Sequence, residues 1–238
     1  MTNIYSDILK SKRSNKKLLA ILLDPDKINL NKVETLIEKI NQSPATHIFV
    51  GGSTVENNIL DELITTIKQN CQLPVVLFPG NSSQFSDKAD AILFLSLISG
   101  RNPDYLIEQQ VQAAPVLKKT QLEIISTGYV LIESGAETAV ERVSQTKPLD
   151  RNNPELVLAT AQAGEMLGKK LIYLEAGSGA KQAVPLEMVQ LVSQNIDIPL
   201  IVGGGIVDLH GIQKVYDAGA DLVVIGTAFE NDLNFFKS

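Results

Sequence analysis

The sequence predicts an α/β protein with the TIM-barrel, or (β/α)8, fold, formed by one domain over residues 1–238. The chain has 238 residues, near the ~250 typical of this fold, and 44% of them are hydrophobic, enough for one large core. Eight short apolar runs alternate with amphipathic segments of helical length, which favours a parallel sheet covered by helices. Two glycine-rich strand ends complete the pattern. We therefore expect eight strands that close into a barrel.

Each predicted strand is apolar over nearly its whole length, as expected of parallel strands that are buried on both faces. The strands are expected at residues 18–23, 47–50, 75–78, 91–97, 123–126, 171–174, 200–202 and 222–225. Amphipathic segments predict helices between most of them, at residues 32–40, 57–69, 154–167, 185–194 and 209–218.

Two connections depart from this regular alternation. The third connection, residues 82–90, is short and polar, so we expect no full helix in it. The fifth connection, residues 128–151, is long and begins with an apolar extension at 129–132. Irregular connections on a rigid scaffold often carry function, so the sequence predicts a specialised substrate cleft beside these two segments.

The composition argues against a nucleic-acid-binding or membrane-spanning protein. The formal net charge is −6, and serine and asparagine interrupt the basic residues at 10–17, which indicates the solvated end of a helix. No apolar run approaches the ~20 residues needed to cross a bilayer. The single cysteine, Cys71, cannot form an internal disulfide, and no signal-peptide pattern begins the chain, so we expect a cytoplasmic protein. Such a protein would meet a lipid in solution or in transient contact with a membrane surface.

The two glycine-bearing strand ends predict a phosphate-binding site. Residues 201–206 read Ile-Val-Gly-Gly-Gly-Ile, and residues 224–228 read Val-Ile-Gly-Thr-Ala. Glycine lets the backbone turn tightly and brings its N–H groups close to an anion. In TIM barrels the loops after strands 7 and 8 form such sites. Ordinary strand-to-helix turns are the alternative.

Carboxylates follow two other predicted strands. Asp24 ends the first strand, with Asp26 and Lys27 just beyond it, and Glu175 ends the sixth. Because Mg²⁺ prefers oxygen ligands and often takes only one or two from the protein, Asp24 and Ser53 could hold it. An Asx turn that caps the first helix is the alternative for Asp24. A carboxylate at a buried strand end must be paired or face a cleft, so Glu175 is the stronger functional candidate.

Other reactive residue types carry less weight. His47 begins a strand and His210 begins a helix, and neither has the spacing of a metal site. Cys71 precedes a strand and is interpreted as a small buried residue. We expect all three to be structural or on the surface.

Taken together, the strand ends resemble those of the geranylgeranylglyceryl phosphate synthase family, which includes the bacterial heptaprenylglyceryl phosphate synthases. The resemblance covers nearly the whole chain in family order, and its most specific part is the tyrosine-containing motif at 173–179. The matching motifs are Leu-Asp-Pro-Asp-Lys at 23–27, Val-Gly-Gly-Ser-Thr at 50–54, Phe-Pro-Gly-Asn at 78–81, Tyr-Leu-Glu-Ala-Gly-Ser-Gly at 173–179, Gly-Gly-Gly-Ile at 203–206 and Gly-Thr at 226–227. The closing pair departs from the Gly-Asn frequent in the family, although Thr227 keeps a backbone N–H for phosphate.

The resemblance implies a Mg²⁺-dependent enzyme that transfers a prenyl group, with geranylgeranyl diphosphate as the expected donor, to sn-glycerol 1-phosphate. An ether bond forms at the sn-3 hydroxyl and diphosphate is released. The resemblance also implies that Asp24 and Ser53 hold Mg²⁺ and that Glu175 accepts the proton of the attacking hydroxyl. The residues that it implies in substrate binding are Lys27, Tyr173, Leu174, Glu175, Ala176, Gly177, Ser178, Gly179, Gly204, Gly205, Gly226 and Thr227.

Two other interpretations stay open. One is a phosphosugar isomerase or flavin-phosphate barrel, which leaves the acidic first strand end and the motif at 173–179 unexplained. The other is a non-catalytic barrel that binds a phospho-ligand. The resemblance further implies a homo-oligomer, with a hexamer favoured over a dimer. Tyr105 is the expected anchor of the subunit contact, because large aromatic residues often fill that role; burial of Tyr105 against its own barrel is the alternative.

Overall fold

A computed structural model describes residues 3–28, 32–52 and 60–237 of the chain. Within them, parallel strands form a closed barrel in chain order, from β1 to β8, which confirms the predicted fold. Pairing of β8 with β1, with Ile225 opposite Ile21, closes the barrel. The strands are β1 (Leu18–Leu23), β2 (His47–Val50), β3 (Val75–Leu77), β4 (Ala91–Leu97), β5 (Glu123–Leu131), β6 (Leu171–Glu175), β7 (Leu200–Gly203) and β8 (Leu222–Ile225).

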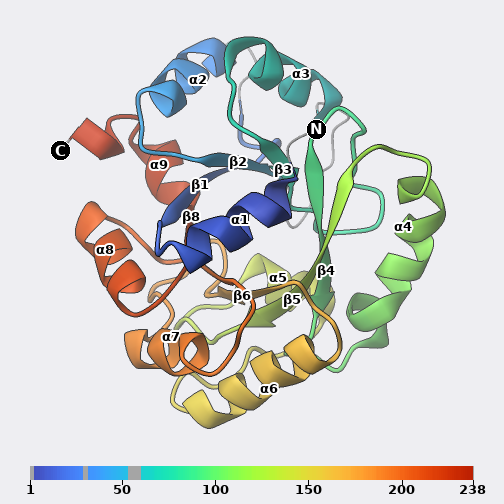
Figure 1. Cartoon of the computed structure of the whole chain (residues 1–238), viewed down its shortest axis with the longest axis vertical. Coiled ribbons are helices and arrows are strands. Elements are labelled where there is room, and N and C mark those ends of the chain that lie inside the picture. Colours follow the sequence, from blue (N-terminus) through green and yellow to red (C-terminus); the bar gives the residue numbers. More distant parts are fainter. Residues whose placement is uncertain (1–2, 29–31, 53–59, 238) are drawn as a thin grey trace.

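Helices surround this barrel, as Figure 1 shows. Those that the sequence predicts occur within a few residues of their expected positions. The α-helices are α1 (Ile4–Arg13), α2 (Val33–Asn41), α3 (Leu60–Asn70), α4 (Gln109–Leu117), α5 (Ala139–Ser144), α6 (Pro154–Met166), α7 (Leu186–Ser193), α8 (Leu209–Asp217) and α9 (Thr227–Asn231). A π-helical turn, η2 (Asp104–Glu108), precedes α4, and a 3-10 turn, η3 (Phe235–Lys237), lies near the C-terminus. None of the helices in the described part of the chain combines the length and apolar character that a bilayer crossing requires.

Side chains alternate between two apolar clusters because successive residues of a strand point to opposite faces. Phe49, Tyr129 and Tyr173 belong to the cluster inside the barrel. Leu174 and Ala176 belong to the cluster between the strands and the surrounding helices. Burial on both faces explains why the strand sequences are continuously apolar.

The two irregular connections differ in how well the sequence predicts them. Between β3 and β4 the described chain forms turns and no helix, as expected. The expectation that the fifth connection begins at residue 128 is wrong. Tyr129 pairs with Leu97 of β4 and with Tyr173 of β6, so the apolar extension continues the strand to Leu131.

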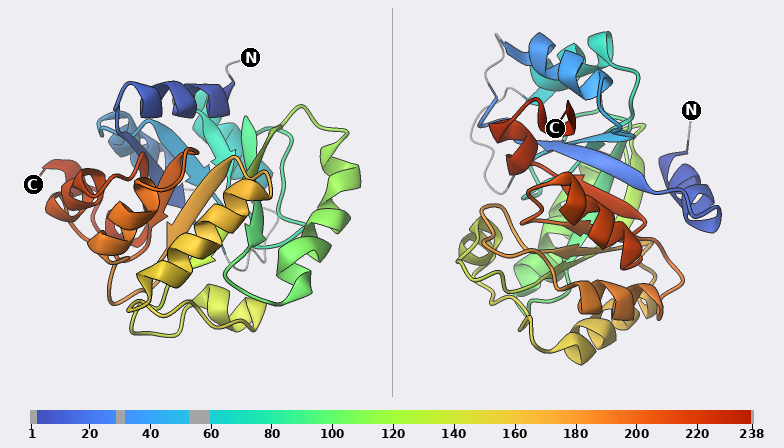
Figure 2. Two further views of the ribbon diagram at one scale, coloured as in Figure 1. Left: turned by 60° about the horizontal axis from the view of Figure 1, so that its bottom comes forward. Right: turned by 90° about the vertical axis from the view of Figure 1, so that its left-hand side faces the viewer.

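The α1 helix covers the N-terminal end of the barrel (Figures 1 and 2). Ile4 and Ile8 are buried and belong to the same cluster as the barrel interior. The carboxylate of Glu123 accepts the backbone N–H groups of Ile4 at 2.6 Å and Tyr5 at 3.0 Å, near the start of the helix. This end is therefore closed, and the opposite end, where the strands have their carboxyl ends, is left for a site.

Candidate active site

A cavity of about 530 Å³ lies at the carboxyl ends of the strands. It brings together residues that are far apart in the sequence, from the ends of β1, β6, β7 and β8. The predicted site residues that line it are Asp24, Lys27, Tyr173, Glu175, Gly177, Ser178, Gly179, Gly204, Gly205, Gly226 and Thr227.

Two of the described predicted site residues are not among those lining the cavity. Leu174 and Ala176 are almost completely buried in the outer cluster, on the far side of the strand from the cavity. A substrate contact by their side chains is therefore ruled out by the alternation along β6. Ser53 lies outside the described residues.

Glu175 occupies the end of β6, and only 6% of the residue is exposed. Its carboxylate accepts the N–H of Gly177 at 2.7 Å. Burial raises the pKa of Glu175, and the Gly177 N–H and the nearby Tyr173 hydroxyl only partly offset this effect. A buried carboxylate with a raised pKa inside a cavity has the character of a general base.

Gly203 makes room for this carboxylate on the neighbouring strand. It pairs with Glu175, and a Cβ atom at position 203 would lie 2.8 Å from Glu175 Oε2 and 2.5 Å from the Tyr173 hydroxyl oxygen. That hydroxyl is buried and lies close to the Glu175 carboxylate. Gly203, the first glycine of the 203–205 run, therefore makes room for the Glu175 carboxylate, a role that the sequence pattern alone does not indicate.

The glycine turns after β7 and β8 present backbone N–H groups to the cavity. Gly204 and Gly205 both have positive φ, at 82° and 69°, a conformation that glycine adopts without strain. The N–H groups of Gly204, Gly205 and Thr227 donate to no group that the structure describes. Free N–H donors on two adjacent turns are suited to an anion such as phosphate.

Asp24 and Lys27 form an ionic group with a residue that the sequence did not single out. The Lys27 ammonium lies 3.4 Å from Asp24 Oδ2 and 3.3 Å from Glu230 Oε2. Burial alone would lower the pKa of Lys27, but the charges of Glu230 and Asp24 outweigh it and raise that pKa. Glu230 belongs to α9. No local signal marks it, because its contact with Lys27 depends on how α9 packs beside β1.

The structure contains the turn of the alternative for Asp24 but not the helix cap, because α2 begins at Val33 with Lys32 at its N-cap. The backbone N–H of Asp26 donates to Asp24 Oδ1 at 3.2 Å, which is the bond of an Asx turn. This leaves Asp24 Oδ2 facing the Lys27 ammonium. One carboxylate thus both shapes the turn and lines the cavity.

The surroundings of Asp24 fit a divalent cation. A Cβ atom at position 52 would lie 2.8 Å from Asp24 Oδ1, so Gly52 leaves room for the Asp24 carboxylate. Among the described residues, no group of three or more metal-ligating side chains occurs. A site with one protein carboxylate suits Mg²⁺, which commonly completes its coordination with substrate phosphates and water.

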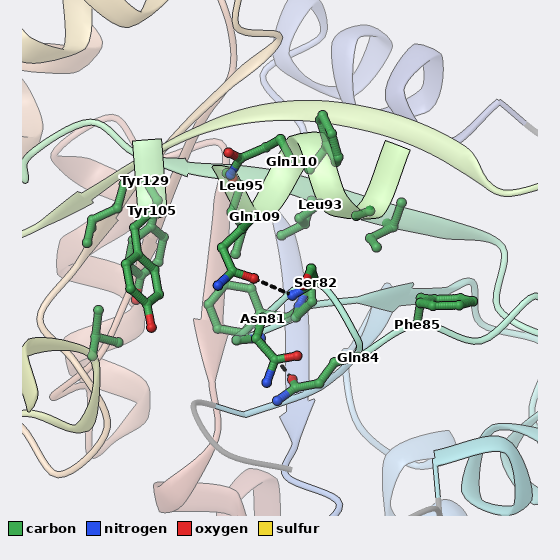
Figure 3. Close-up of a pocket in the computed structure, with 18 of the residues that line it drawn as sticks. Asn81, Ser82, Gln84, Phe85, Leu93, Leu95, Tyr105, Gln109, Gln110 and Tyr129 are labelled. Atoms are coloured by element: carbon green, nitrogen blue, oxygen red, sulfur yellow. Dashed lines mark hydrogen bonds between the residues drawn. The ribbon is translucent and has the colours of Figure 1, made fainter. Parts of the chain in front are cut away.

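A second, apolar pocket of about 110 Å³ adjoins the cavity. Gly52, Phe78, Tyr129 and Val140 line both. The pocket lies between α4 and the helix-free connection after β3, as Figure 3 shows.

Hydrogen bonds tie these two walls of the pocket together. The Ser82 N–H donates to Gln109 Oε1 at 2.7 Å, and the Ser82 hydroxyl donates to Gln112 Oε1 at 2.9 Å.

Tyr105 is part of this pocket. Its ring and that of Tyr129 both line the apolar space (Figure 3), and the Tyr105 hydroxyl donates to the carbonyl of Val143 at 3.1 Å. The structure therefore favours the alternative, burial against its own subunit, over a role for Tyr105 as the anchor of a subunit contact.

The fold and the site together define a class of protein. It is a TIM barrel whose candidate active-site cavity combines glycine turns after β7 and β8 with a buried carboxylate and an adjoining apolar pocket. Within that class, the chain belongs to the PcrB family, whose sequence profile matches residues 8–237.

Individual relatives cover the chain almost completely. A geranylgeranylglyceryl phosphate synthase of Flavobacterium johnsoniae is 71% identical over 100% of this chain and 98% of its own length. One of Zunongwangia profunda is 52% identical over 97% and 98%. Among solved structures, the (S)-3-O-geranylgeranylglyceryl phosphate synthase of Thermoplasma acidophilum, in complex with its substrate sn-glycerol-1-phosphate, superimposes with a TM-score of 0.94 at 34% identity. The superposition covers 100% of this chain and 95% of the Thermoplasma acidophilum chain.

Proposed function

We propose that this protein is a prenyltransferase that joins a prenyl group to sn-glycerol 1-phosphate through an ether bond, with geranylgeranyl diphosphate as the donor. One observation carries the proposal: Glu175 lies in a cavity that is lined by charged side chains and glycine turns and that continues into an apolar pocket. A phosphate ester and a hydrocarbon chain need these two environments side by side. The names of the relatives, and the glycerol phosphate bound by the Thermoplasma acidophilum enzyme, support the same reaction.

The glycine turns are the proposed site for the phosphate of glycerol phosphate. The free N–H groups of Gly204, Gly205 and Thr227 supply donors to its oxygens. Gly177, Ser178 and Gly179, on the neighbouring wall, enclose the glycerol part. Anchoring the phosphate at one end fixes how far the terminal hydroxyl reaches across the cavity.

Glu175 is the proposed general base. The glycerol hydroxyl gives its proton to the Glu175 carboxylate as its oxygen bonds to the first carbon of the prenyl chain. The bond from that carbon to the diphosphate oxygen breaks, and diphosphate takes both electrons. The tight packing beside Gly203 and Gly177 holds the carboxylate in place for this transfer.

The apolar pocket is the proposed site of the prenyl chain. Phe78 and Tyr129 line both spaces, so they lie where the reactive end of the chain has to meet the glycerol. Their ring centroids are each 5.4 Å from that of Tyr173. Because the chain is buried here, its apolar surface contributes to binding the donor.

Mg²⁺ is the proposed cofactor, held by Asp24 and by Ser53 as predicted. The charge of the cavity supports this cofactor. The described lining carries the carboxylates of Asp24, Glu175 and Glu230 and the ammonium of Lys27. Because the cavity also has to accept two anionic substrates, a cation is needed to offset the negative charge. When bound, a divalent cation neutralises charge that develops on the leaving diphosphate. We expect Asp24→Asn to abolish magnesium-dependent transfer while the circular dichroism spectrum stays unchanged.

An assay with labelled sn-glycerol 1-phosphate and a panel of prenyl diphosphates tests the function. We expect one ether product with geranylgeranyl diphosphate, and loss of turnover in Glu175→Gln. A barrel that only binds a phospho-ligand would retain glycerol phosphate and form no product with any donor. An isomerase would convert a phosphosugar without a prenyl donor.

We further propose that the protein is a cytoplasmic homo-oligomer, with a hexamer favoured over a dimer. The exposed apolar residues Ile107 and Val111, 58% and 56% exposed beside the pocket, replace Tyr105 as the expected contact. Light scattering on wild type and Ile107→Ser measures the mass of each. A monomeric wild type would contradict the proposal.

A further inference from the structure

The ammonium of Lys27 is shared between two carboxylates from opposite ends of the chain. It lies 3.4 Å from Asp24 Oδ2 and 3.3 Å from Glu230 Oε2. The two carboxylate side chains are only 21% and 16% exposed, whereas the lysine side chain is 48% exposed. The carboxylates are therefore the more fixed partners, and the lysine is the more mobile one.

This arrangement creates a competition at Asp24. The proposed function requires Asp24 to hold a divalent cation, and a lysine ammonium on the same carboxylate opposes that cation through its own charge. The cation would have to break the pair formed by Asp24 and Lys27, because the Lys27 ammonium lies 3.4 Å from Asp24 Oδ2. Glu230 offers the ammonium another partner at nearly the same distance.

We propose that Glu230 is a positioning residue, which takes the Lys27 ammonium when a divalent cation binds Asp24, so that lysine and cation do not compete for one carboxylate. The inference rests on the proposed function, since it deepens the role of the Asp24 site.

The backbone around the three residues suits this transfer. The Lys27 N–H donates to the Asp24 carbonyl at 3.0 Å, so the lysine extends from the same turn as the carboxylate. The Glu230 N–H donates to the Gly226 carbonyl at 3.0 Å, so Glu230 is attached to the turn proposed to bind phosphate. The ammonium thus changes partner by a side-chain movement alone, with both turns left in place.

Binding of Mn²⁺ to the full-length protein without substrates, followed by electron paramagnetic resonance, tests the proposal. We expect Glu230→Gln to raise the Kd for Mn²⁺ about twofold to fivefold, the range that a partly exposed ion pair supports. Lys27→Met removes the competitor and is expected to lower the Kd. In the Lys27→Met background, Glu230→Gln is expected to change the Kd by less than about twofold, because Glu230 acts through the lysine.

The controls separate this role from simpler ones. Lys10→Met removes an exposed ion pair on α1, where Lys10 lies 3.0 Å from Asp7, and is expected to leave the Kd unchanged. An equal effect of Glu230→Gln in both backgrounds would overturn the proposal, because Glu230 would then act by its own charge or as a ligand.

Asp24→Asn is the control for the cation site itself. We expect it to abolish Mn²⁺ binding. Undiminished binding in Asp24→Asn would overturn the cation site together with this inference. Abolished binding with equal Glu230→Gln effects would overturn the inference alone and leave the proposed function standing.

Discussion

The carboxylate of Glu175 fills the space that a side chain at Gly204 would need. A Cβ atom at position 204 would clash with Glu175 Oε1 and lie 2.7 Å from the Gly177 nitrogen. The residue that is proposed to accept a proton and the turn that is proposed to hold phosphate are therefore packed as one unit.

Gly204→Ala tests this packing against a matched control. Gly204 and Gly168 have nearly the same φ, 82° and 83°, but nothing lies within 4 Å of a Cβ atom at position 168. Both substitutions carry the backbone cost of alanine at positive φ, about 1–2 kcal/mol. Only Gly204→Ala displaces Glu175, so we expect it to lower kcat/KM roughly a hundredfold, whereas Gly168→Ala keeps near-normal turnover. Equal kinetics in the two variants would contradict the packing argument.

Glu175→Gln is expected to lower kcat by about 10²–10⁴, the usual contribution of a general base. Wild-type kcat/KM is expected to fall with decreasing pH as Glu175 is protonated, at a pH above the ordinary titration range of a glutamate, because burial raises its pKa. A pH-rate profile with an acid limb at the ordinary glutamate position would count against this assignment.

The same raised pKa gives stability a pH dependence opposite to that of activity: activity is expected to fall as pH decreases, and stability to fall as pH increases. The folded protein keeps the Glu175 proton to a higher pH than the unfolded chain does, so its ionisation lowers the free energy of unfolding as pH rises through the folded pKa. Thermal denaturation is therefore expected to give a higher Tm for Glu175→Gln than for wild type at neutral pH. The difference disappears below the pKa of a glutamate in the unfolded chain.

The cavity predicts a preference between the two enantiomers of glycerol phosphate. With the phosphate fixed at the glycine turns, inversion of the central carbon moves the hydroxyl away from Glu175, and an error of ~1 Å costs about a hundredfold. We expect sn-glycerol 1-phosphate to exceed the 3-phosphate by at least this factor in kcat/KM. Comparable turnover of both would show that Glu175 does not fix the nucleophile.

His47 predicts part of the acid sensitivity of the fold. It is 5% exposed, its Nδ1 lies 2.8 Å from the Thr46 hydroxyl, and burial lowers its pKa to about 4. Protonation of the unfolded chain below a pH of ~6.5 therefore reduces stability until the folded pKa is reached, by up to roughly 3 kcal/mol. In His47→Gln, the urea concentration at the denaturation midpoint is expected to depend less on pH between these two pKa values than it does in the wild type. The exposed His210 supplies the control, and His210→Gln is expected to leave the profile unchanged.

The sequence predicted the barrel because parallel strands buried on both faces leave a continuous apolar pattern, and it predicted the glycine turns because only glycine tolerates their backbone. It did not predict the side on which each residue of a motif lies. Leu174 stands inside the strand 6 motif but points toward the helices. Glu230 reaches Lys27 only because α9 packs beside β1, and no local sequence pattern near either residue indicates this packing. The length of β5 was underestimated because an apolar loop and an apolar strand extension look alike in sequence.

The closed N-terminal end of the barrel has a kinetic consequence. Because α1 covers that end, with Ile4 and Ile8 buried, both substrates of the proposed reaction are expected to enter, and both of its products to leave, at the opposite end. The ether lipid is poorly soluble in water, so its departure depends on an acceptor such as a detergent micelle or a vesicle. Without an acceptor, rapid-quench measurements are expected to show a burst of product followed by slow turnover, and vesicles are expected to raise the slow rate alone.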